Sequence, residues 1–509
     1  MKLNFFATRP DHPLGEAKEF KRVLAELPRD AFKAIDEVYG WFDSLRQADD
    51  FRLDYLYEVV GGLDKAAQPH LKRLARHYLG TPRLSKNDER RLWTMCFNYW
   101  GEVSRLYATC IERFNRNPKD KGAGAFKGDI PVVATRLMAA RSNQLKWIDY
   151  RYGVVGEDLW HGIGLPYLAA EAGGYAQKPL QIYPGTPVTT SVAMQYLQTL
   201  VRESSSVNML LPFEIEMADR LIAHFLPAFV FGAECSPGNA YWYWIDAAGT
   251  MPPTRLVSRP EHASPSLRFF HLGAAFPVLD ELMHTVERGT IPKELNLGME
   301  CPATALLKVL RHLAQYWAPV SPKRKYVRHA VKTRMAVLRG FDNSLAVFAG
   351  NVARLGVEQS AESWVVEDVS LGGFRAGTEA AGDWLTIGSL LCLQPEGGNN
   401  WVLGVVRRRN VTADAQAVIG IQTLSRNAQS IELRPRATGI LAADAIPGIW
   451  LRGDGASEQI RLMLPPRNFN VRQILEFVQD DKRYLLTPVE LEESDGDFEI
   501  GIYREQLLE

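Results

Sequence analysis

Cysteine is scarce in this sequence. Five cysteines occur among 509 residues, and no two have Cys-x-x-Cys spacing: Cys96, Cys110, Cys235, Cys301 and Cys392. An odd, scattered set in a chain of this size argues against the disulfide framework of a small secreted protein. We therefore expect reduced thiols and a cytoplasmic protein.

Long apolar runs and an excess of one charge are also missing. The longest apolar stretch, 221–233, is shorter than the about 20 residues that cross a membrane, and the N-terminus shows no signal-peptide pattern. Lys plus Arg and Asp plus Glu both total 59, so the net charge is zero. Such a chain binds an anion only through a local basic cluster, which argues against a general nucleic-acid coat. The shortness of the apolar stretch argues against a membrane span.

Familiar catalytic motifs are absent as well. The sequence contains no HExxH, GxSxG or paired-cysteine pattern. The segment 122–128 lacks the Gly-Lys-[Ser/Thr] ending of a phosphate loop, so a loop over 115–128 is the better interpretation. Glu281 and His284 have helical spacing, but a di-iron bundle needs a second such pair. The sequence predicts no catalytic residue, no metal site and no cofactor.

Helical periodicity dominates the first 320 residues. Apolar residues recur at helical spacing over 20–39 and 92–110, with Ser85 as the expected N-cap of the second helix. Further helices are predicted at 192–201, 213–225, 278–286 and 306–317. The aromatic run 241–244 and the segment 254–256 are typical of a hairpin. We divide this part into a helical domain, 1–175, and a mixed, mainly helical region, 176–320.

Short strands replace helices after Trp317. We expect strands at 336–338, 345–349, 364–368, 390–393, 401–406 and 417–422, separated by turn residues. Several short, evenly spaced strands favour a closed antiparallel barrel over 321–428. Strands near 449–452, 460–464, 484–491 and 498–503 predict a further β-rich domain over 429–509, which is compatible with a second barrel. The fold class is therefore multidomain α+β.

The junction between the two halves is strongly basic. Residues 321–334 read SPKRKYVRHAVKTR, with six Lys or Arg and no acid. Arg324 and Arg328 have RxxxR spacing, and residues 368–373 read DVSLGG, which fits DxSxxG. Gly404 to Arg407 and Gly420 to Gln422 then fall on expected barrel strands.

This order of motifs resembles the PilZ family of bacterial cyclic di-GMP receptors, over about residues 321–428. The resemblance implies a six-stranded antiparallel barrel in which Arg324 and Arg328 hold the phosphates and bases of cyclic di-GMP. It also implies that Asp368, Ser370 and Gly373 form the edge that faces guanine, while Gly372 and Gly373 allow close backbone approach. The gap from Arg328 to Asp368 is long for the family, and we place the excess near 351–363.

Elementary chemistry agrees with these roles. Guanidinium groups pair with phosphate oxygens, donate to guanine O6 and N7, and stack on purines, while a carboxylate accepts from the N1–H and N2–H edge. The basic Lys323 before the first arginine is typical of family members that bind a stacked pair of ligands, and Arg407 is a candidate to assist it. Two plainer interpretations remain: an Asx-type turn at Asp368 and Ser370, and a nucleic-acid patch in the basic run.

The sequence thus predicts a non-enzymatic cyclic di-GMP effector that acts on a partner protein through residues 1–320. Two alternatives stay open. The barrel is an interaction module that binds no nucleotide, or the helical part is an enzyme of a kind that its sequence does not reveal.

Overall fold

The computed structural model divides the chain into two compact units, residues 1–322 and 323–509. The residues that it describes are 10–81, 84–184, 189–235, 242–256, 260, 264–298, 301–318, 326–350, 361–379, 382, 384–398, 400–412, 416–436, 445–452, 459–479 and 482–508. Within these ranges, no helix combines the length and the apolar composition that crossing a membrane requires.

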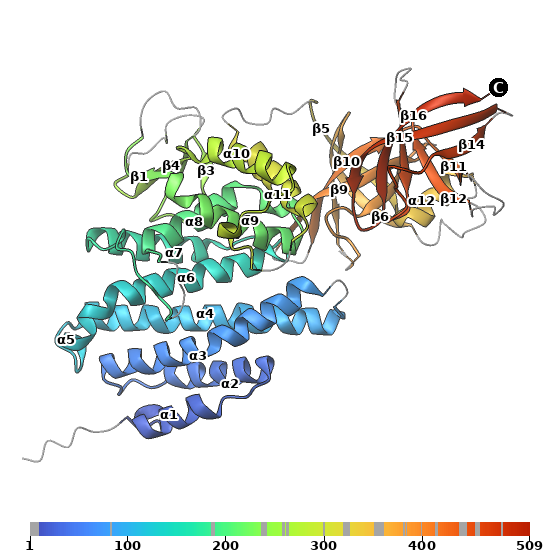
Figure 1. Ribbon diagram of the computed structural model, residues 1–509. Coiled ribbons are helices and arrows are strands. Elements are labelled where there is room, and N and C mark those ends of the chain that lie inside the picture. The colour runs from blue at the N-terminus through green and yellow to red at the C-terminus, as the bar shows by residue number, and fades with distance from the viewer. Residues whose placement is uncertain are drawn as a thin grey trace, which may run out of the picture. The chain divides into compact units, whose positions relative to one another are not determined.

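The first unit is a stack of helices with a small sheet. In Figure 1, α2, α3, α4, α6 and α8 lie as successive layers, and each packs on the next. The α-helices are α1 (Ala17–Glu26), α2 (Ala31–Arg46), α3 (Leu53–Gly80), α4 (Lys86–Arg116), α5 (Ala123–Phe126), α6 (Ile130–Asp149), α7 (Glu157–Ala172), α8 (Val192–Ser204), α9 (Pro212–Phe225), α10 (Ala275–Glu287) and α11 (Ala303–Trp317). Short 3-10 helices accompany them: η1 (Pro13–Gly15), η2 (Lys127–Asp129), η3 (Val207–Met209), η4 (Leu226–Ala228) and η5 (Lys293–Leu295).

A four-stranded antiparallel sheet completes the first unit, in the order β1-β4-β2-β3. Its strands are β1 (Val230–Gly232), β2 (Tyr243–Asp246), β3 (Thr254–Arg255) and β4 (Leu267–His271). Tyr243 pairs with Arg255, which confirms the predicted hairpin, and the Tyr243 ring stacks on Phe270. The aromatic run therefore serves hairpin packing in its described part.

Buried polar residues tie the helices together. Asp64 on α3 is fully buried and accepts hydrogen bonds from the hydroxyls of Tyr99, Tyr107 and Tyr183 at 2.7–2.9 Å. A buried carboxylate is tolerated only when such donors satisfy it. Ser85 caps α4 as predicted, since its hydroxyl accepts from the Asp88 amide.

The second unit consists of two closed six-stranded barrels. The first has the strand order β10-β7-β6-β5-β8-β9, with β5 (His329–Arg339), β6 (Glu362–Ser370), β7 (Gly373–Thr378), β8 (Leu390–Pro395), β9 (Val402–Val411) and β10 (Ala417–Ser425). The second has the order β11-β12-β13-β16-β15-β14, with β11 (Ala428–Pro435), β12 (Ile446–Leu451), β13 (Gln459–Leu464), β14 (Leu475–Gln479), β15 (Lys482–Ser494) and β16 (Glu499–Leu508). The predicted fold class, helices followed by an antiparallel barrel and a β-rich part, is confirmed.

Two local predictions are wrong. The expected strand 345–349 belongs to helix α12 (Gly340–Phe348), which buries Phe341, Ser344 and Val347 at helical spacing. A short apolar run does not by itself distinguish a strand from a helix. The expected loop 115–128 contains the short helix α5, which buries Ala123 and Phe126.

The two barrels share one hydrophobic core. It combines residues of the first barrel and α12 with residues of the second: Phe341, Leu390, Leu403, Val405, Ile449, Leu451, Met463, Phe498 and Ile500. Strands β8 and β9 consequently bury consecutive side chains, Leu390–Leu393 and Val402–Val406. An antiparallel strand with one solvated face would alternate instead. The second unit is therefore two barrels packed as one body.

Candidate functional site

A tight hairpin between β6 and β7 positions the DxSxxG residues. Ser370 and Gly373 are cross-strand partners, so Leu371 and Gly372 form the two-residue tip. The Ser370 hydroxyl donates to the Gly373 carbonyl oxygen at 3.3 Å, which supports the turn interpretation for this residue. The hydroxyl thus holds the tip and remains part-buried at the surface of the first barrel.

Glycine is required at position 373 by a close approach. Its φ is +155°, and a Cβ added there would lie 1.9 Å from the Ile421 carbonyl oxygen on β10. Gly373 also pairs with Gln422 across the β7–β10 ladder. At Gly372, an added Cβ would lie 2.8 Å from the ring of Tyr326. The absence of side chains here lets the hairpin tip pack under neighbouring groups.

Arg328 lies directly on this hairpin. Its Nη1 donates to both carboxylate oxygens of Asp368, at 2.9 and 3.0 Å. Asp368 lies within strand β6, opposite Ala330 and Arg375, so the Asx-turn interpretation does not apply to it. The side chains of Arg328 and Asp368 are 38% and 18% exposed, and both therefore remain accessible to a ligand.

Arg407 has a different environment. Its Nε donates to Gln422 Oε1 at 2.7 Å, and its Nη2 donates to Glu493 Oε2 of the second barrel, also at 2.7 Å. Asp495 lies 3.6 Å from the same guanidinium. Burial raises the pKa of Glu493, and Arg407 opposes this rise. The structure therefore places Arg407 beside the partner strand of Gly373, in an ion pair that joins the barrels.

The structure thus brings five predicted residues to one hairpin: Arg328, Asp368, Ser370, Gly372 and Gly373. Lys323 and Arg324 lie outside the described residues, so their predicted roles stay predictions. Part of the long gap before Asp368 is helix α12, which the sequence interpretation did not expect.

Two further residues at this hairpin were not predicted. Tyr326, inside the RxxxR motif, places its ring against Gly372. Arg426, between β10 and β11, donates to the carbonyl oxygens of Ser370 and Leu371 at 3.3 and 3.1 Å. Tyr326 could have been singled out from the sequence, because it is an aromatic residue between the two arginines of the motif. Nothing in the sequence marks Arg426, because these two hydrogen bonds go to backbone atoms of a distant turn.

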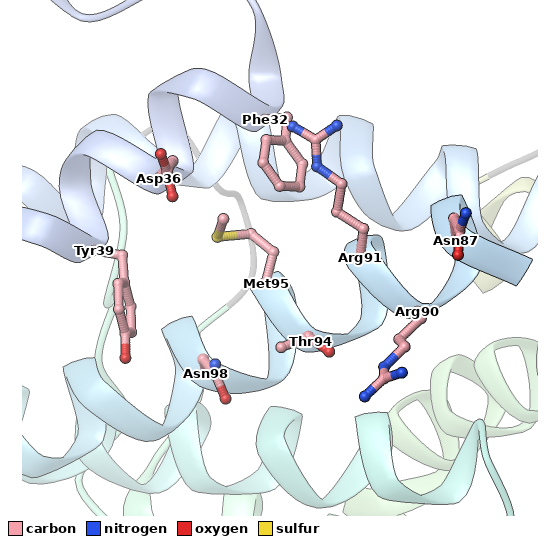
Figure 2. Close-up of a pocket in the computed structure, with 9 residues that line it drawn as sticks. All are labelled: Phe32, Asp36, Tyr39, Asn87, Arg90, Arg91, Thr94, Met95 and Asn98. Atoms are coloured by element: carbon pink, nitrogen blue, oxygen red, sulfur yellow. The ribbon is translucent and has the colours of Figure 1, made fainter.

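The helical unit contains an open pocket of about 450 Å³ between α2 and α4. Figure 2 shows Phe32, Asp36 and Tyr39 on one side and Arg90, Arg91, Thr94, Met95 and Asn98 on the other. The guanidinium of Arg91 lies 3.7 Å from the centroid of the Phe32 ring. The pocket thus offers polar and cationic groups around an aromatic side chain.

The described residues contain no group of three or more His, Cys, Asp or Glu side chains arranged to hold a metal ion. None of the cysteines, all of which are among the described residues, forms a disulfide. Burial raises the pKa of Cys96, Cys110 and Cys392, which makes these thiols poor nucleophiles.

Comparison with known proteins adds one finding. Residues 18–234 match the family described as "Cyclic-di-GMP receptor FimW, N-terminal domain". The match spans α1 to β1 and ends before the barrels begin, so it bears on the helical unit and not on the RxxxR and DxSxxG residues. The matched family is described as a receptor and not as an enzyme. No curated protein matches the chain.

Proposed function

We propose that this protein is a cyclic di-GMP effector whose first barrel binds the dinucleotide and whose helical unit contacts a partner protein. One observation carries the proposal: Arg328, from the basic junction, meets Asp368 on a hairpin whose tip packs closely against its neighbours at two glycines. A guanidinium for phosphate and a carboxylate for the guanine edge lie side by side there.

The match of the helical unit supports the same ligand independently. It concerns a separate part of the chain, and its family is named for cyclic di-GMP reception. The nucleic-acid interpretation of the basic run explains neither the Arg328–Asp368 pair nor the glycine hairpin. A role as a non-binding interaction module explains the packing of the barrel but not this accessible pair.

Calorimetric titration with cyclic di-GMP tests the proposal. We expect Arg328→Ala to weaken binding by roughly ten- to a hundredfold, because a charge-assisted hydrogen bond contributes about 1.5–3 kcal/mol. Arg334→Ala is the matched control: it removes the same charge from β5, but Arg334 bonds Ser363, at the end of β6 away from the hairpin tip. Equal losses in the two variants would indicate general anion binding and contradict the site. No binding by the wild type would favour the interaction module.

The variant Asp368→Ala is tested in the same calorimetric titration. Asp368→Ala is expected to lower affinity for cyclic di-GMP more than affinity for cyclic di-AMP, and so to lower the preference for guanine, because adenine has no N1–H and N2–H donors for a carboxylate. An unchanged preference would remove Asp368 from the guanine edge.

The number of bound ligands depends on Lys323. We propose that it supports a stacked pair of cyclic di-GMP molecules, because an additional cation offsets the repulsion between four phosphate charges. The wild type should bind two ligands per chain in the calorimeter, and Lys323→Leu should bind closer to one while keeping measurable affinity. A wild-type ratio near one contradicts the stacked pair and leaves the receptor proposal intact.

A further inference from the structure

The second barrel contacts the residues that support the ligand hairpin. Glu493 on β15 accepts from Arg407 Nη2 at 2.7 Å, and the Nε of the same guanidinium donates to Gln422. Gln422 is the cross-strand partner of Gly373. A β-bulge between Leu491 and Glu493 interrupts the regular alternation of β15 at this point, and bulges commonly re-aim side chains. One side chain therefore connects the second barrel to the strand beside the hairpin.

The turn between β15 and β16 adds two more contacts to the first barrel. Asp497 accepts from the backbone amide of Leu390 at 3.1 Å. The carboxylate of Asp495 lies over Gly388, about 3 Å from the place of a Cβ at that residue. Three acidic side chains of this turn region thus contact β8, β9 or the turn before β8. The contacts are specific and polar, in addition to the shared apolar core.

A third set of hydrogen bonds connects the hairpin tip with the second barrel. Arg426, in the short connection between the barrels, holds the Ser370 and Leu371 carbonyl oxygens. The preceding residue, Ser425, donates to the Arg452 carbonyl oxygen at the end of the second barrel. Two adjacent residues, Ser425 and Arg426, therefore link the hairpin tip to the second barrel by hydrogen bonds.

We propose that the second barrel is a coupled part of the ligand site, in which Glu493 is a positioning residue that fixes Arg407 and, through Gln422, the strand beside Gly373. The inference rests on the proposed function, because its ligand is cyclic di-GMP. Coupling between two sites is reciprocal. Loss of Glu493 therefore weakens ligand binding at the first barrel, and ligand binding there stabilises β15 in the second.

Titration of the full chain with cyclic di-GMP tests the first half of this coupling. Glu493→Gln keeps the side-chain size and removes the charge, and we expect a three- to tenfold loss of affinity. Glu492→Gln is the matched control. It removes the neighbouring carboxylate, whose partner Arg461 belongs to the second barrel as well, so that this pair does not connect the two barrels. We expect less than a twofold change for the control. Glu493→Asp, which restores the charge, should recover part of the loss.

Amide hydrogen exchange tests the second half. Saturating cyclic di-GMP should slow exchange over 482–494 in the wild type and in Glu492→Gln, and not in saturated Glu493→Gln. A purely structural role of Glu493 would lower thermal stability without removing this ligand-dependent protection.

The outcomes separate the two proposals. A wild type that binds no cyclic di-GMP overturns the proposed function. A wild type that binds, with equal affinity in Glu493→Gln and Glu492→Gln or with β15 exchange unchanged by ligand, overturns the coupling alone.

Discussion

Gly388 lies at a close contact between the two barrels. Gly388 precedes β8, has a φ of +86°, and bonds its amide to the Val406 carbonyl oxygen at 2.9 Å. The Asp495 carboxylate of the second barrel lies about 3 Å from the place of a Cβ, closer than an ordinary contact. Both the backbone conformation and this contact therefore favour glycine at this position.

Gly388→Ala is expected to destabilise the second unit by about 2–4 kcal/mol. Left-handed backbone costs a residue with a Cβ about 1–2 kcal/mol, and displacement of Asp495 adds the rest. Chemical denaturation followed by tryptophan fluorescence measures the change. Gly397→Ala is the control, since Gly397 has a similar φ of +75° and open space around its Cβ position. Equal effects of the two variants would show that the Asp495 contact contributes nothing.

At the scale of secondary-structure elements, the sequence was most informative where periodicity was long. The helices with apolar residues at 92–110 and 306–317 were predicted because their stripes extend over several turns. Strand β7, with two glycines in six residues, was recognised only as part of a motif. Strands β11 and β14 were missed, and α12 was taken for a strand. Short elements are specified by their neighbours, which a single sequence does not show.

Some residues of the candidate site could be predicted from the sequence and others could not. Arg328, Asp368, Ser370 and the glycines were found because a motif fixes their spacing. The packing of Tyr326 on Gly372, the reach of Arg426 and the pairing of Arg407 with Glu493 depend on tertiary contacts over long sequence distances. Conversely, the helical unit, in which the sequence indicated no chemistry, is the part that matches a known receptor family.

Helices α6, α8 and α9 meet at a buried group of charges. Asp219 on α9 accepts from Lys146 and from Arg202 at 3.0 Å, and Arg202, fully buried, also binds Asp149 at 2.9 Å. Burial acts to raise the pKa of Asp219, but Lys146 and Arg202 outweigh it and hold the pKa far below its usual value. The ionised carboxylate is therefore the form that stabilises this junction.

Asp219→Asn should lower the free energy of unfolding of the helical unit by about 3–5 kcal/mol at neutral pH, because it removes the carboxylate that two buried cations, Lys146 and Arg202, share. A folded pKa below the unfolded one contributes stability that is complete above about pH 4 and is lost as the pH falls further. The difference between wild type and variant should thus stay constant from pH 7 to 5. Below pH 4 it should shrink by at most about 1.4 kcal/mol per pH unit. Urea denaturation across this range measures it, and a difference independent of pH would contradict the role of the ionised Asp219.

At the scale of the whole molecule, the second barrel covers apolar side chains of the first barrel, which explains why the two occur together. The outer faces of β8 and β9 are apolar, and Leu390, Leu403 and Val405 share a core with Ile449, Met463 and Ile500 of the second barrel. The RxxxR and DxSxxG pattern and the strands that follow it end at about residue 428, whereas the core continues beyond that point. Full burial of an aliphatic side chain contributes about 1.5–3 kcal/mol, so three such residues account for roughly 5–9 kcal/mol.

A fragment of residues 321–428 is therefore expected not to fold on its own, because this loss is comparable with the about 5–15 kcal/mol stability of a whole domain. The fragment 323–509 should unfold in one cooperative transition and bind cyclic di-GMP as the full chain does, since it contains both barrels and their common core. Circular dichroism, thermal denaturation and calorimetric titration of the two fragments measure the difference. A folded 321–428 fragment with the affinity of the full chain would show that the shared core is dispensable. It would also make the second barrel a separate domain with a task of its own.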